Sequence, residues 1–587
     1  MQNRRYFLRN ASLAAACSAV PLRKLQAFTM SPAAPRPAAA LALGDIHARG
    51  ELLSRLLRNY DRLEEDYYTP EHDFAAGGAS EGWPGDKEGR IILALTLQAQ
   101  ATGREPKYLA EIIRQLALHV NGKGYLGPLM GDKIMEQQLS GHGWLLRGLS
   151  EYYLWKEDPV AKAHIDDIVT NLALPTRGAY REYPIDPESR QKQAGGAAGN
   201  TDKTLGRWMV STDIGCAFIF LDGVVQAYAI SPSAPLKALI EEMIDRFCQI
   251  DLEAIQAQTH ATLTALRGLL RFQRITGSAS LVTEAEKRYR LYRSRAMTEN
   301  YENFNWFGRP EWTESCAIVD SMMVAMELWQ ATGDAGYLED AHHIYYNGIC
   351  HVQRTNGGFG LDNCPPAAGP LLKVNTDEAY WCCTMRGAEG LASRMRYGYV
   401  PASESLTVPF YGSSTAKFSF PRGEVVIGQE SAYPFSGKVT FDILRGEASD
   451  EVPWKLFVAS WMKNPRLTLD GRKISSRVNH GFLPCKVPLK QGTRLVFEFD
   501  QPLDFGHRVN HHYGDKTLRG ITYGPLVLGT SSSEEISLPG SPLLERTGER
   551  EWRLKGTSQL FSPVYHLMDP RVTKESGYHK QILFKIG

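Results

Sequence analysis

The chain has 587 residues, and its 66 lysines and arginines nearly cancel 65 aspartates and glutamates, which leaves a formal net charge of +1 at pH 7. This balance excludes a protein that binds nucleic acid through bulk positive charge. A composition of 43% hydrophobic and 22% charged residues excludes a disordered scaffold. Because one hydrophobic core stops growing at about 250–300 residues, we expect more than one domain.

The first 30 residues resemble an export signal. Arg4 and Arg5 precede a short apolar run from Ala11 to Ala19, which is typical of a twin-arginine-like signal. We therefore expect an exported protein that works in the periplasm or outside the cell. Cys17 leaves a lipid anchor open, and a basic surface helix is the alternative interpretation. No later apolar stretch has the length of a membrane-spanning helix, so we expect no transmembrane segment in the mature chain.

From residue 40 to residue 400, apolar residues recur at helical spacing. Leu53, Leu56, Tyr60 and Leu63 share one helical face, and later segments repeat the pattern. Three predicted helices end in a Thr-Gly pair, where glycine supplies the left-handed residue that often follows a helix. These pairs are Thr102-Gly103, Thr276-Gly277 and Thr332-Gly333. Recurrent amphipathic helices of this kind predict a mainly α catalytic domain, built as an (α/α)6 barrel.

The pattern changes after residue 400. Residues 438–444 and 493–500 alternate polar and apolar side chains, and Asp470-Gly471 is a strong signal for a β-hairpin. Several short strands separated by turn residues are typical of a β-sandwich. We therefore predict an all-β sandwich domain over residues 401–587.

Four potential metal ligands lie in two short segments of the helical region. Glu314 and Cys316 are separated by one residue, and Cys382 and Cys383 follow 66 residues later. Zinc prefers four ligands, and thiolates dominate its closed sites. Adjacent cysteines reach one ion only where the backbone is irregular, so we place them at a turn before a helix. Buried free thiols or a vicinal disulfide are the alternative interpretations.

Further short motifs follow one another along most of the mature chain. They are Gly82-Trp83-Pro84-Gly85, Gly141-His142, His260-Ala261-Thr262, Tyr346-Asn347-Gly348 and Gly524-Pro525-Leu526-Val527. Together with Glu314-Ser-Cys316 and Trp381-Cys382-Cys383, they resemble glycoside hydrolase family 127, the β-L-arabinofuranosidase family. The common order of the motifs makes this resemblance specific.

The resemblance implies a retaining glycosidase that depends on Zn²⁺. Its metal ligands would be Glu314, Cys316, Cys382 and Cys383, and Cys382 would also be the catalytic nucleophile. The substrate would be an oligo- or polysaccharide of plant or algal origin, from which the enzyme releases a terminal β-L-arabinofuranose or a related sugar. A bound cation would hold the attacking thiol as thiolate.

A carboxyl group must also protonate the departing oxygen and later activate water. The segment Glu302-Asn-Phe304 resembles the family's Glu-x-Phe motif, so Glu302 is the expected acid/base. Glu299 is the second candidate, because the spacing from Glu302 to Glu314 is shorter than usual in the family. A solvated loop carboxylate is the alternative for either residue.

Five residues are candidates for sugar binding. The resemblance assigns His142 and His260 to inner helices, where each either binds a sugar hydroxyl or is a satisfied core histidine. His342 stands where the family usually has a glutamate. Trp306 and Trp381 lie beside the acid candidates and the cysteine pair, where their rings either stack on a sugar or pack in the core. Since several sugar-contacting positions, His342 among them, differ from the family pattern, the reaction type is better determined than the sugar.

Two alternatives to this function stay open at the sequence level. One is an α/α-barrel polysaccharide lyase or uronyl hydrolase, in which the cysteines are incidental. The other is a non-catalytic carbohydrate-binding protein with a structural zinc. The sequence gives neither the linkage cleaved nor the oligomeric state.

Overall fold

The computed structural model describes residues 41–75, 82–190, 201–311, 313–365, 369–402, 404–420, 423–531, 534–565 and 578–587. The predicted export signal, with Cys17, lies outside the described residues. Among the described helices, none combines the length and apolarity needed to cross a bilayer.

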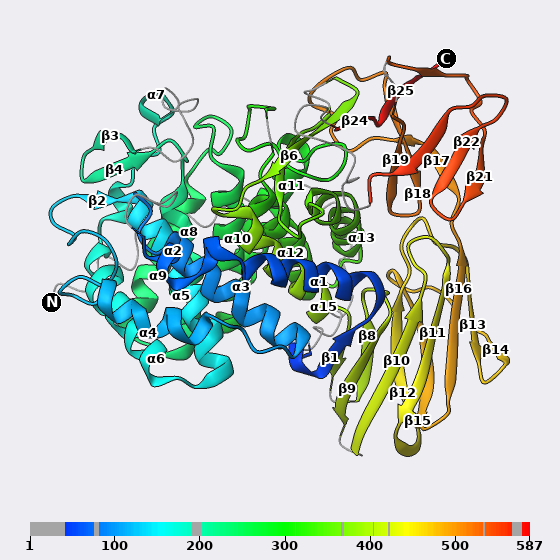
Figure 1. Cartoon of the computed structure of the whole chain (residues 1–587), viewed down its shortest axis with the longest axis horizontal. Coiled ribbons are helices and arrows are strands. Elements are labelled where there is room, and N and C mark those ends of the chain that lie inside the picture. The colour runs from blue at the N-terminus through cyan, green and yellow to red at the C-terminus, as the bar shows by residue number, and fades with distance from the viewer. Residues whose placement is uncertain are drawn as a thin grey trace, which may run out of the picture. The chain divides into compact units, whose positions relative to one another are not determined.

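Within the described part of the chain, six helices form a closed ring. Each contacts the next one, and the last contacts the first. In ring order they are α3 (Asp86–Thr102), α5 (Glu136–Lys156), α8 (Ile219–Ile230), α10 (Thr259–Thr276), α12 (Ser315–Thr332) and α15 (Cys383–Arg396). Figure 1 shows these helices in blue to yellow-green. The predicted (α/α)6 barrel is confirmed.

Each inner helix packs against one outer helix. The outer helices are α1 (Gly50–Leu63), α4 (Leu109–His119), α6 (Pro159–Ile168), α9 (Ala234–Cys248), α11 (Ala279–Arg295) and α13 (Gly336–His343). The inner helices α3, α10 and α12 end as expected, since Gly103, Gly277 and Gly333 each have a positive φ and cap the helix before them. Short helices in the connections are α2 (Pro70–Asp73), α7 (Pro187–Arg190), α14 (Cys350–Val352) and the π-helix η8 (Ile344–Ile349).

Glycine lets the inner helices approach one another closely. A Cβ atom on Gly89 of α3 would lie 2.2 Å from backbone atoms of Trp144 and Leu145 in α5. A Cβ atom on Gly223 of α8 would lie 2.4 Å from the carbonyl oxygen of Gly143, also in α5. These contacts are too short for any side chain, so the ring has its observed width because these positions are glycine.

The strands after residue 400 form three sheets. A seven-stranded sheet has the order β1-β9-β10-β11-β16-β13-β14, and β10 and β11 contact β12 and β15 of a four-stranded sheet with the order β15-β12-β8-β7. This pair of sheets is the predicted sandwich. Their strands are β1 (Ile46–Ala48), β7 (Val400–Ala402), β8 (Ser405–Val408), β9 (Ser414–Phe420), β10 (Gly423–Ser431), β11 (Lys438–Arg445), β12 (Glu447–Phe457), β13 (Lys463–Leu469), β14 (Arg472–Ile474), β15 (Phe482–Lys490) and β16 (Arg494–Asp500).

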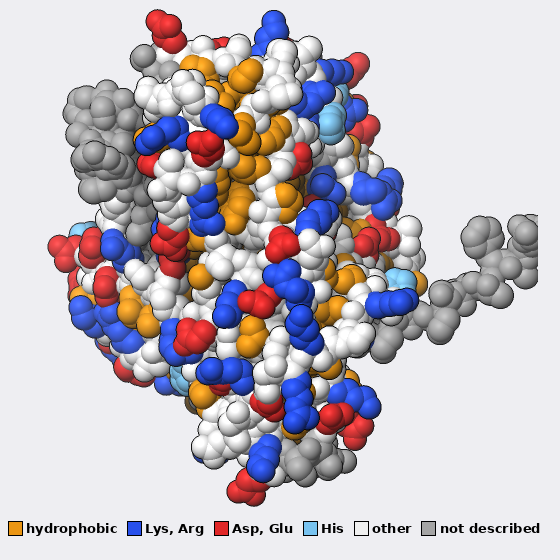
Figure 2. Space-filling model, turned by 90° about the vertical axis from the view of Figure 1, so that its right-hand side faces the viewer, with side chains coloured by type: hydrophobic (Ala, Val, Ile, Leu, Met, Phe, Trp, Pro, Cys, Tyr) orange, Lys and Arg blue, Asp and Glu red, His pale blue; other side chains and the backbone are white. Residues whose placement is uncertain are grey.

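A further sheet forms from the last strands, with the order β20-β25-β18-β19-β23-β22-β21 and β17 paired to β18. They are β17 (Leu503–His507), β18 (Arg519–Tyr523), β19 (Leu526–Gly529), β20 (Ser537–Leu538), β21 (Leu544–Gly548), β22 (Glu551–Leu554), β23 (Leu560–Pro563) and β25 (Leu583–Ile586). Positive and negative side chains are interspersed over the face seen in Figure 2, in keeping with the small net charge.

Two three-stranded sheets are formed largely by connections between the barrel helices. One is formed by β2 (Ile134–Met135), β4 (Trp208–Ser211) and β3 (Thr201–Leu205), and the other by β5 (Gly360–Asn363), β6 (Leu371–Glu378) and β24 (Tyr578–Gln581). Through β24 the end of the chain pairs with the segment that precedes the cysteine pair. The N-terminal strand β1 likewise pairs with β9. The barrel and the β region are therefore joined by strands from both ends of the described chain.

Candidate functional site

The four predicted metal ligands converge at the N-terminal ends of two neighbouring inner helices. Glu314 is the N-cap of α12 and Cys316 is its second residue, whereas Cys382 is the N-cap of α15 and Cys383 is its first residue. One ligand atom from each lies within 4.8 Å of all the others. The Sγ atom of Cys383 is 3.7 Å from that of Cys316 and 3.5 Å from that of Cys382.

The environment of the cluster favours negative charge at one of its three sulfurs, that of Cys383. The N-terminus of a helix carries a partial positive charge, and two such ends face the cluster. Burial raises the pKa of Cys383, but hydrogen bonds with Cys316 and Cys382 outweigh it and hold this pKa well below its ordinary value. Hydrogen bonds with Cys316 and Cys383 raise the pKa of Cys382, and burial raises that of Cys316. Cys382 alone of the four is partly exposed, so its side chain is the most accessible of the cluster.

An arginine that the sequence analysis did not single out contacts the cluster. The Nη1 atom of Arg90 donates to the Sγ atom of Cys316 over 3.4 Å. Asp86, one turn earlier on α3, accepts from the Nε and Nη2 atoms of Arg90. The Gly82-Trp83-Pro84-Gly85 motif leads into the start of α3, but it does not indicate this contact.

His260 connects the cluster to the barrel axis. Its Nδ1 atom lies 3.4 Å from an oxygen of Glu314, and its Nε2 atom lies 3.4 Å from an oxygen of Asp320. The ring stacks on Trp144 with a centroid distance of 5.5 Å. Gln258 also approaches Glu314, with 3.4 Å between Nε2 and Oε2. His260 therefore lies between Glu314 of the cluster and Asp320 inside the barrel.

Below the cluster, a buried network of charges links the inner helices α5, α10, α12 and α15. Glu389 of α15 binds the guanidinium groups of Arg147, Arg267 and Arg386, and Asp320 binds Arg267 and Arg386. Burial and the nearby Arg267 lower the pKa of Arg147 to about 9. Trp144 lies under Arg90, Arg147 and Arg386 at 4.0–4.4 Å. The network fixes the helices that carry the cluster.

Two family models match this chain. Residues 255–396 match the catalytic domain of the β-L-arabinofuranosidases of glycoside hydrolase family 127, and residues 405–501 match the middle domain of the same family. The chain carries the catalytic and middle domains of glycoside hydrolase family 127. It is therefore a glycoside hydrolase, and the family 127 catalytic domain includes all four residues of the cluster.

Solved structures agree with this assignment at the level of the fold. A family 127 β-arabinofuranosidase superposes with a TM-score of 0.70 at 14% identity, covering 94% of this chain and 98% of its own. A family 127 β-L-arabinofuranosidase from Geobacillus stearothermophilus T6 superposes with a TM-score of 0.69 at 14% identity, covering 92% and 100%. No curated protein matches the chain. At this identity the likeness establishes the fold.

The two acid/base candidates of this family 127 domain have different surroundings. Glu299 accepts from the backbone amides of Val509 and Asn510 and pairs with Arg508 at 3.0 Å. Its carboxylate is thus used to hold the C-terminal β region. Glu302 is fully buried. Burial, and to a smaller extent the nearby Asp362, raises the pKa of its carboxyl group well above the ordinary value.

Glu302 belongs to a second buried group beside the cysteine cluster. Single ligand atoms of Glu302, His351 and Asp362 lie within 4.8 Å of one another, and Cys364 Sγ is 3.3 Å from Glu302 Oε2. Thr313 joins the two groups, because its hydroxyl accepts from the amide of Asp362 and it precedes Glu314 in the chain. The Glu302 group and the cluster therefore flank the same short segment, 313–315. In the described residues no hydrogen bond or ion pair joins Glu302 or Glu299 to Cys316, Cys382 or Cys383.

Two of the predicted sugar-binding histidines are satisfied within the protein. His142 donates from Nδ1 to the carbonyl of Gln138 and accepts at Nε2 from the amide of Leu126. His342 bonds to the Tyr433 hydroxyl and to the carbonyl of Pro409. Burial lowers the pKa of His142 to about 4 and that of His342 to about 3. Both are neutral core residues with no ring nitrogen left for a sugar hydroxyl. For His142 this matches the alternative interpretation given above, a core histidine whose hydrogen bonds are satisfied within the protein.

The two tryptophans differ in exposure. Trp381 is 40% exposed and lies directly before Cys382, and its ring meets that of Tyr380 edge to face at 5.0 Å. Trp306 is buried, forms a β-bridge with Gln258 and stacks with Arg309. Trp381 therefore presents an open aromatic surface beside the nucleophile candidate, whereas Trp306 packs behind the Glu314 ligand.

A third acidic group on the α3 side of the site was also missed from sequence. Asp73 and Glu88 are buried together, and Lys87 lies 3.9 Å from Asp73. Burial raises the pKa of Asp73 to about 7 and that of Glu88 to about 8. Tyr67 lies near both this pair and the cluster. Burial raises the pKa of Tyr67 most, and the nearby Tyr380, Asp73 and Cys382 raise it further.

Proposed function

We propose that the protein is a retaining glycosidase that releases a terminal β-L-arabinofuranose, or a closely related sugar, from plant or algal glycans. The observation that carries the proposal is the convergence of three sulfurs and one carboxylate, of which Cys382 alone is partly exposed. The exposed ring of Trp381 beside it suits a sugar face. The family of the catalytic domain supports the sugar.

The donor set fits zinc. With zinc–sulfur bonds of about 2.3 Å, two sulfurs of a tetrahedral site are about 3.8 Å apart, close to the observed 3.5 and 3.7 Å. Glu314, Cys316, Cys382 and Cys383 would hold the ion. Bound there, it would keep the thiol of Cys382 deprotonated and lower its basicity, so that the sulfur can both attack and leave.

The reaction would proceed by two displacements at the anomeric carbon. The Cys382 thiolate forms a carbon–sulfur bond while the bond to the glycosidic oxygen breaks, and Glu302 gives its proton to that oxygen. The ionised Glu302 then takes a proton from water as the water oxygen attacks the same carbon. The carbon–sulfur bond breaks, which restores the thiolate and the protonated carboxyl group. Two inversions give retention.

Glu302 is the proposed acid/base because burial and Asp362 favour its protonated form. An acid catalyst must carry its proton when the substrate arrives. Burial raises the pKa of Glu299 as well, but Arg508 and two backbone amides oppose this rise and engage its carboxylate, so Glu299 is less suitable.

The test is activity on an aryl β-L-arabinofuranoside. We expect Cys382→Ser to reduce kcat by at least about a thousandfold, while Cys248→Ser, a half-buried thiol on the outer helix α9, leaves it unchanged. Glu302→Gln should accumulate a glycosyl adduct on Cys382, visible by mass spectrometry. Full activity of Cys382→Ser would refute the nucleophile, and an adduct in Glu299→Gln instead would reassign the acid/base.

Export is part of the proposal. Twin-arginine signals carry folded proteins, so the metal site would form before the chain leaves the cytoplasm. Exchanging both Arg4 and Arg5 for lysine should retain the protein in the cytoplasm. Equal amounts of wild type and variant outside the cytoplasm would refute this route.

A further inference from the structure

A small cavity lies away from the cysteine cluster, where the start of α1, the π-helix η8 and the end of α15 meet the β region. Its volume is about 180 Å³, below the 300–1,000 Å³ of pockets for drug-sized ligands, which suits one sugar residue. Arg394 lines it from the last turn of α15. Cys383 stands eleven residues earlier on that helix, or roughly 16 Å along its axis. The cavity is therefore separate from the proposed active site.

Arg394 is a buried cation without a carboxylate partner. It is only 5% exposed, its Nη2 atom donates to the carbonyl of Tyr411 over 2.7 Å, and its Nε atom has no hydrogen-bond partner. The guanidinium lies over the rings of Tyr345 and Phe410. Among the residues that the structure describes, no Asp or Glu forms an ion pair with it. A buried charge of this kind is costly unless an opposite charge meets it.

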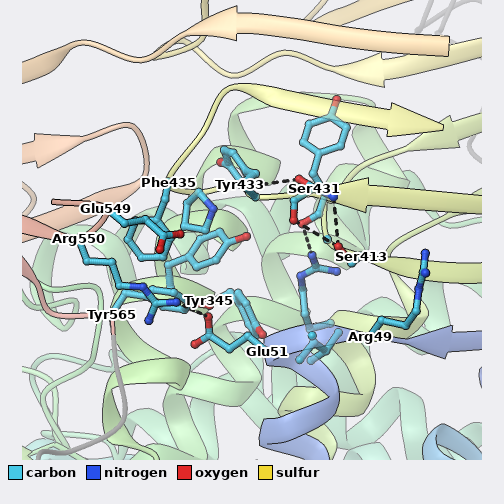
Figure 3. Close-up of a pocket in the computed structure, with 18 residues that line it drawn as sticks. Arg49, Glu51, Tyr345, Ser413, Ser431, Tyr433, Phe435, Glu549, Arg550 and Tyr565 are labelled. Carbon is cyan, nitrogen blue, oxygen red and sulfur yellow. Dashed lines mark hydrogen bonds and ion pairs between the residues drawn. The ribbon is translucent and has the colours of Figure 1, made fainter.

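Of the other four charged groups that line the cavity, Arg49, Glu51 and Arg550 form ion pairs and Glu549 is exposed. Glu51 pairs with Arg55 at 2.8 Å and with Arg550 at 3.8 Å, and Arg49 pairs with Glu430 at 2.6 Å. Figure 3 shows Arg550 and Glu549 on one side of the cavity and Arg49 on the other. The lining has three arginines, Arg394 included, and two glutamates. The buried charge without a carboxylate partner is therefore positive and lies at Arg394.

The rest of the lining is aromatic and hydroxylic. Tyr345, Tyr433, Phe435 and Tyr565 surround the cavity in Figure 3, together with Ser413 and Ser431. Aromatic rings pack on the apolar faces of sugars, and hydroxyl groups exchange hydrogen bonds with sugar hydroxyls. A guanidinium group binds a planar carboxylate through paired hydrogen bonds. A sugar ring that carries a carboxylate would satisfy all three features.

We propose that this cavity binds a uronic acid residue of the polysaccharide, with its carboxylate on Arg394 and its ring between the tyrosines. Such a site would hold an acidic glycan on the enzyme independently of bond cleavage. It does not rest on the proposed hydrolysis, because none of its residues belongs to the cysteine cluster or to the Glu302 group.

The experiment measures binding of galacturonate and glucuronate to the full-length protein by isothermal titration calorimetry. Galactose tests whether a sugar ring without a carboxylate binds, and inorganic sulfate tests whether an anion without a sugar ring binds. We expect the uronates to bind and Arg394→Gln to weaken them at least tenfold. Since a buried substitution can unfold the protein, Arg550→Gln and Glu549→Gln at the mouth provide a second test. The first should weaken uronate binding several-fold and the second should strengthen it. Arg553→Gln, on the exposed side of the same hairpin, is the matched control.

Four results would overturn the proposal: no uronate binding, equal affinity for galactose, equal affinity for sulfate, or uronate affinities that the Arg550→Gln and Glu549→Gln variants leave unchanged. Activity on an aryl glycoside, measured in parallel, separates these outcomes from a failure of the proposed hydrolase. Loss of hydrolysis with intact uronate binding would count against the proposed hydrolase and leave the uronate site standing.

Discussion

Arg90 donates a hydrogen bond to the sulfur of Cys316, and Asp86 holds the other side of the same guanidinium group. A sulfur that accepts from a cation is stabilised as thiolate. Because Asp86 orients Arg90 through two bonds, the position of the donor is fixed by α3 and not by the cysteine segments. One turn of α3 therefore acts as the outer support of a site whose ligands come from α12 and α15.

Removal of this support should weaken metal binding. We expect Arg90→Gln to lower zinc affinity by about 10–100-fold, the usual effect of losing a partner that orients a ligand. Competition against a chromogenic chelator measures the affinity. Arg114→Gln, an exposed arginine on α4, is the control and should match wild type. Equal zinc affinity of Arg90→Gln and Arg114→Gln would contradict a role for Arg90 at the cluster.

The buried pair of Asp73 and Glu88 should make stability depend on pH. Burial raises the pKa of Asp73 to about 7 in the folded protein, against about 3.9 in an unfolded chain. A raised carboxyl pKa means that the folded state binds the proton more tightly. This contribution is complete below about pH 4 and is lost as pH rises through about 7.

We therefore expect the free energy of unfolding of wild type to fall between about pH 4 and pH 7, with Asp73 contributing on the order of a few kcal/mol. Asp73→Asn should flatten this slope, because an amide cannot titrate. Urea unfolding at several pH values measures it, with the exposed Glu71→Gln as control. Identical slopes in the two variants would refute the assignment.

The sequence was sufficient where a feature depends on local pattern. The Thr-Gly helix ends, the strands after residue 400 and the turn at Cys382 follow from propensity and spacing, and the structure has all of them. The contact of Arg90 with Cys316 joins residues 226 positions apart, and no local signal encodes such a contact. His142 shows the opposite difficulty, since its motif marks an inner helix but does not reveal that Gln138 and Leu126 occupy both ring nitrogens.

The spacing of the inner helices should be sensitive to a single methyl group. Gly89→Ala places a Cβ atom 2.2 Å from the α5 backbone, far closer than non-bonded atoms can approach, so α3 and α5 must separate. We expect a loss of at least about 1–3 kcal/mol in the free energy of unfolding. Gly122→Ala has open space around its Cβ position and serves as the control. Similar midpoints of urea unfolding for the two variants would mean that the ring widens freely.

The buried network at the barrel axis should depend on the charge of Glu389. This carboxylate binds Arg147, Arg267 and Arg386 at once, and its side chain is nearly inaccessible. In Glu389→Gln the shape is kept but the negative charge is lost, which leaves buried guanidinium groups with Asp320 and Asp222 as their remaining carboxylate partners. Loss of one partner from a buried ion pair costs about 3–5 kcal/mol.

The matched control is Glu151→Gln, whose partner Arg396 is 29% exposed at a distance of 3.8 Å. Solvent screens such a pair, so its loss should cost at most about 1 kcal/mol. Urea unfolding compares the two variants directly. Because Asp320 also faces His260, and His260 faces Glu314, Glu389→Gln should in addition lower zinc affinity, whereas Glu151→Gln should not. A large loss of stability with unchanged zinc affinity would show that the axis supports the barrel without orienting the metal ligands.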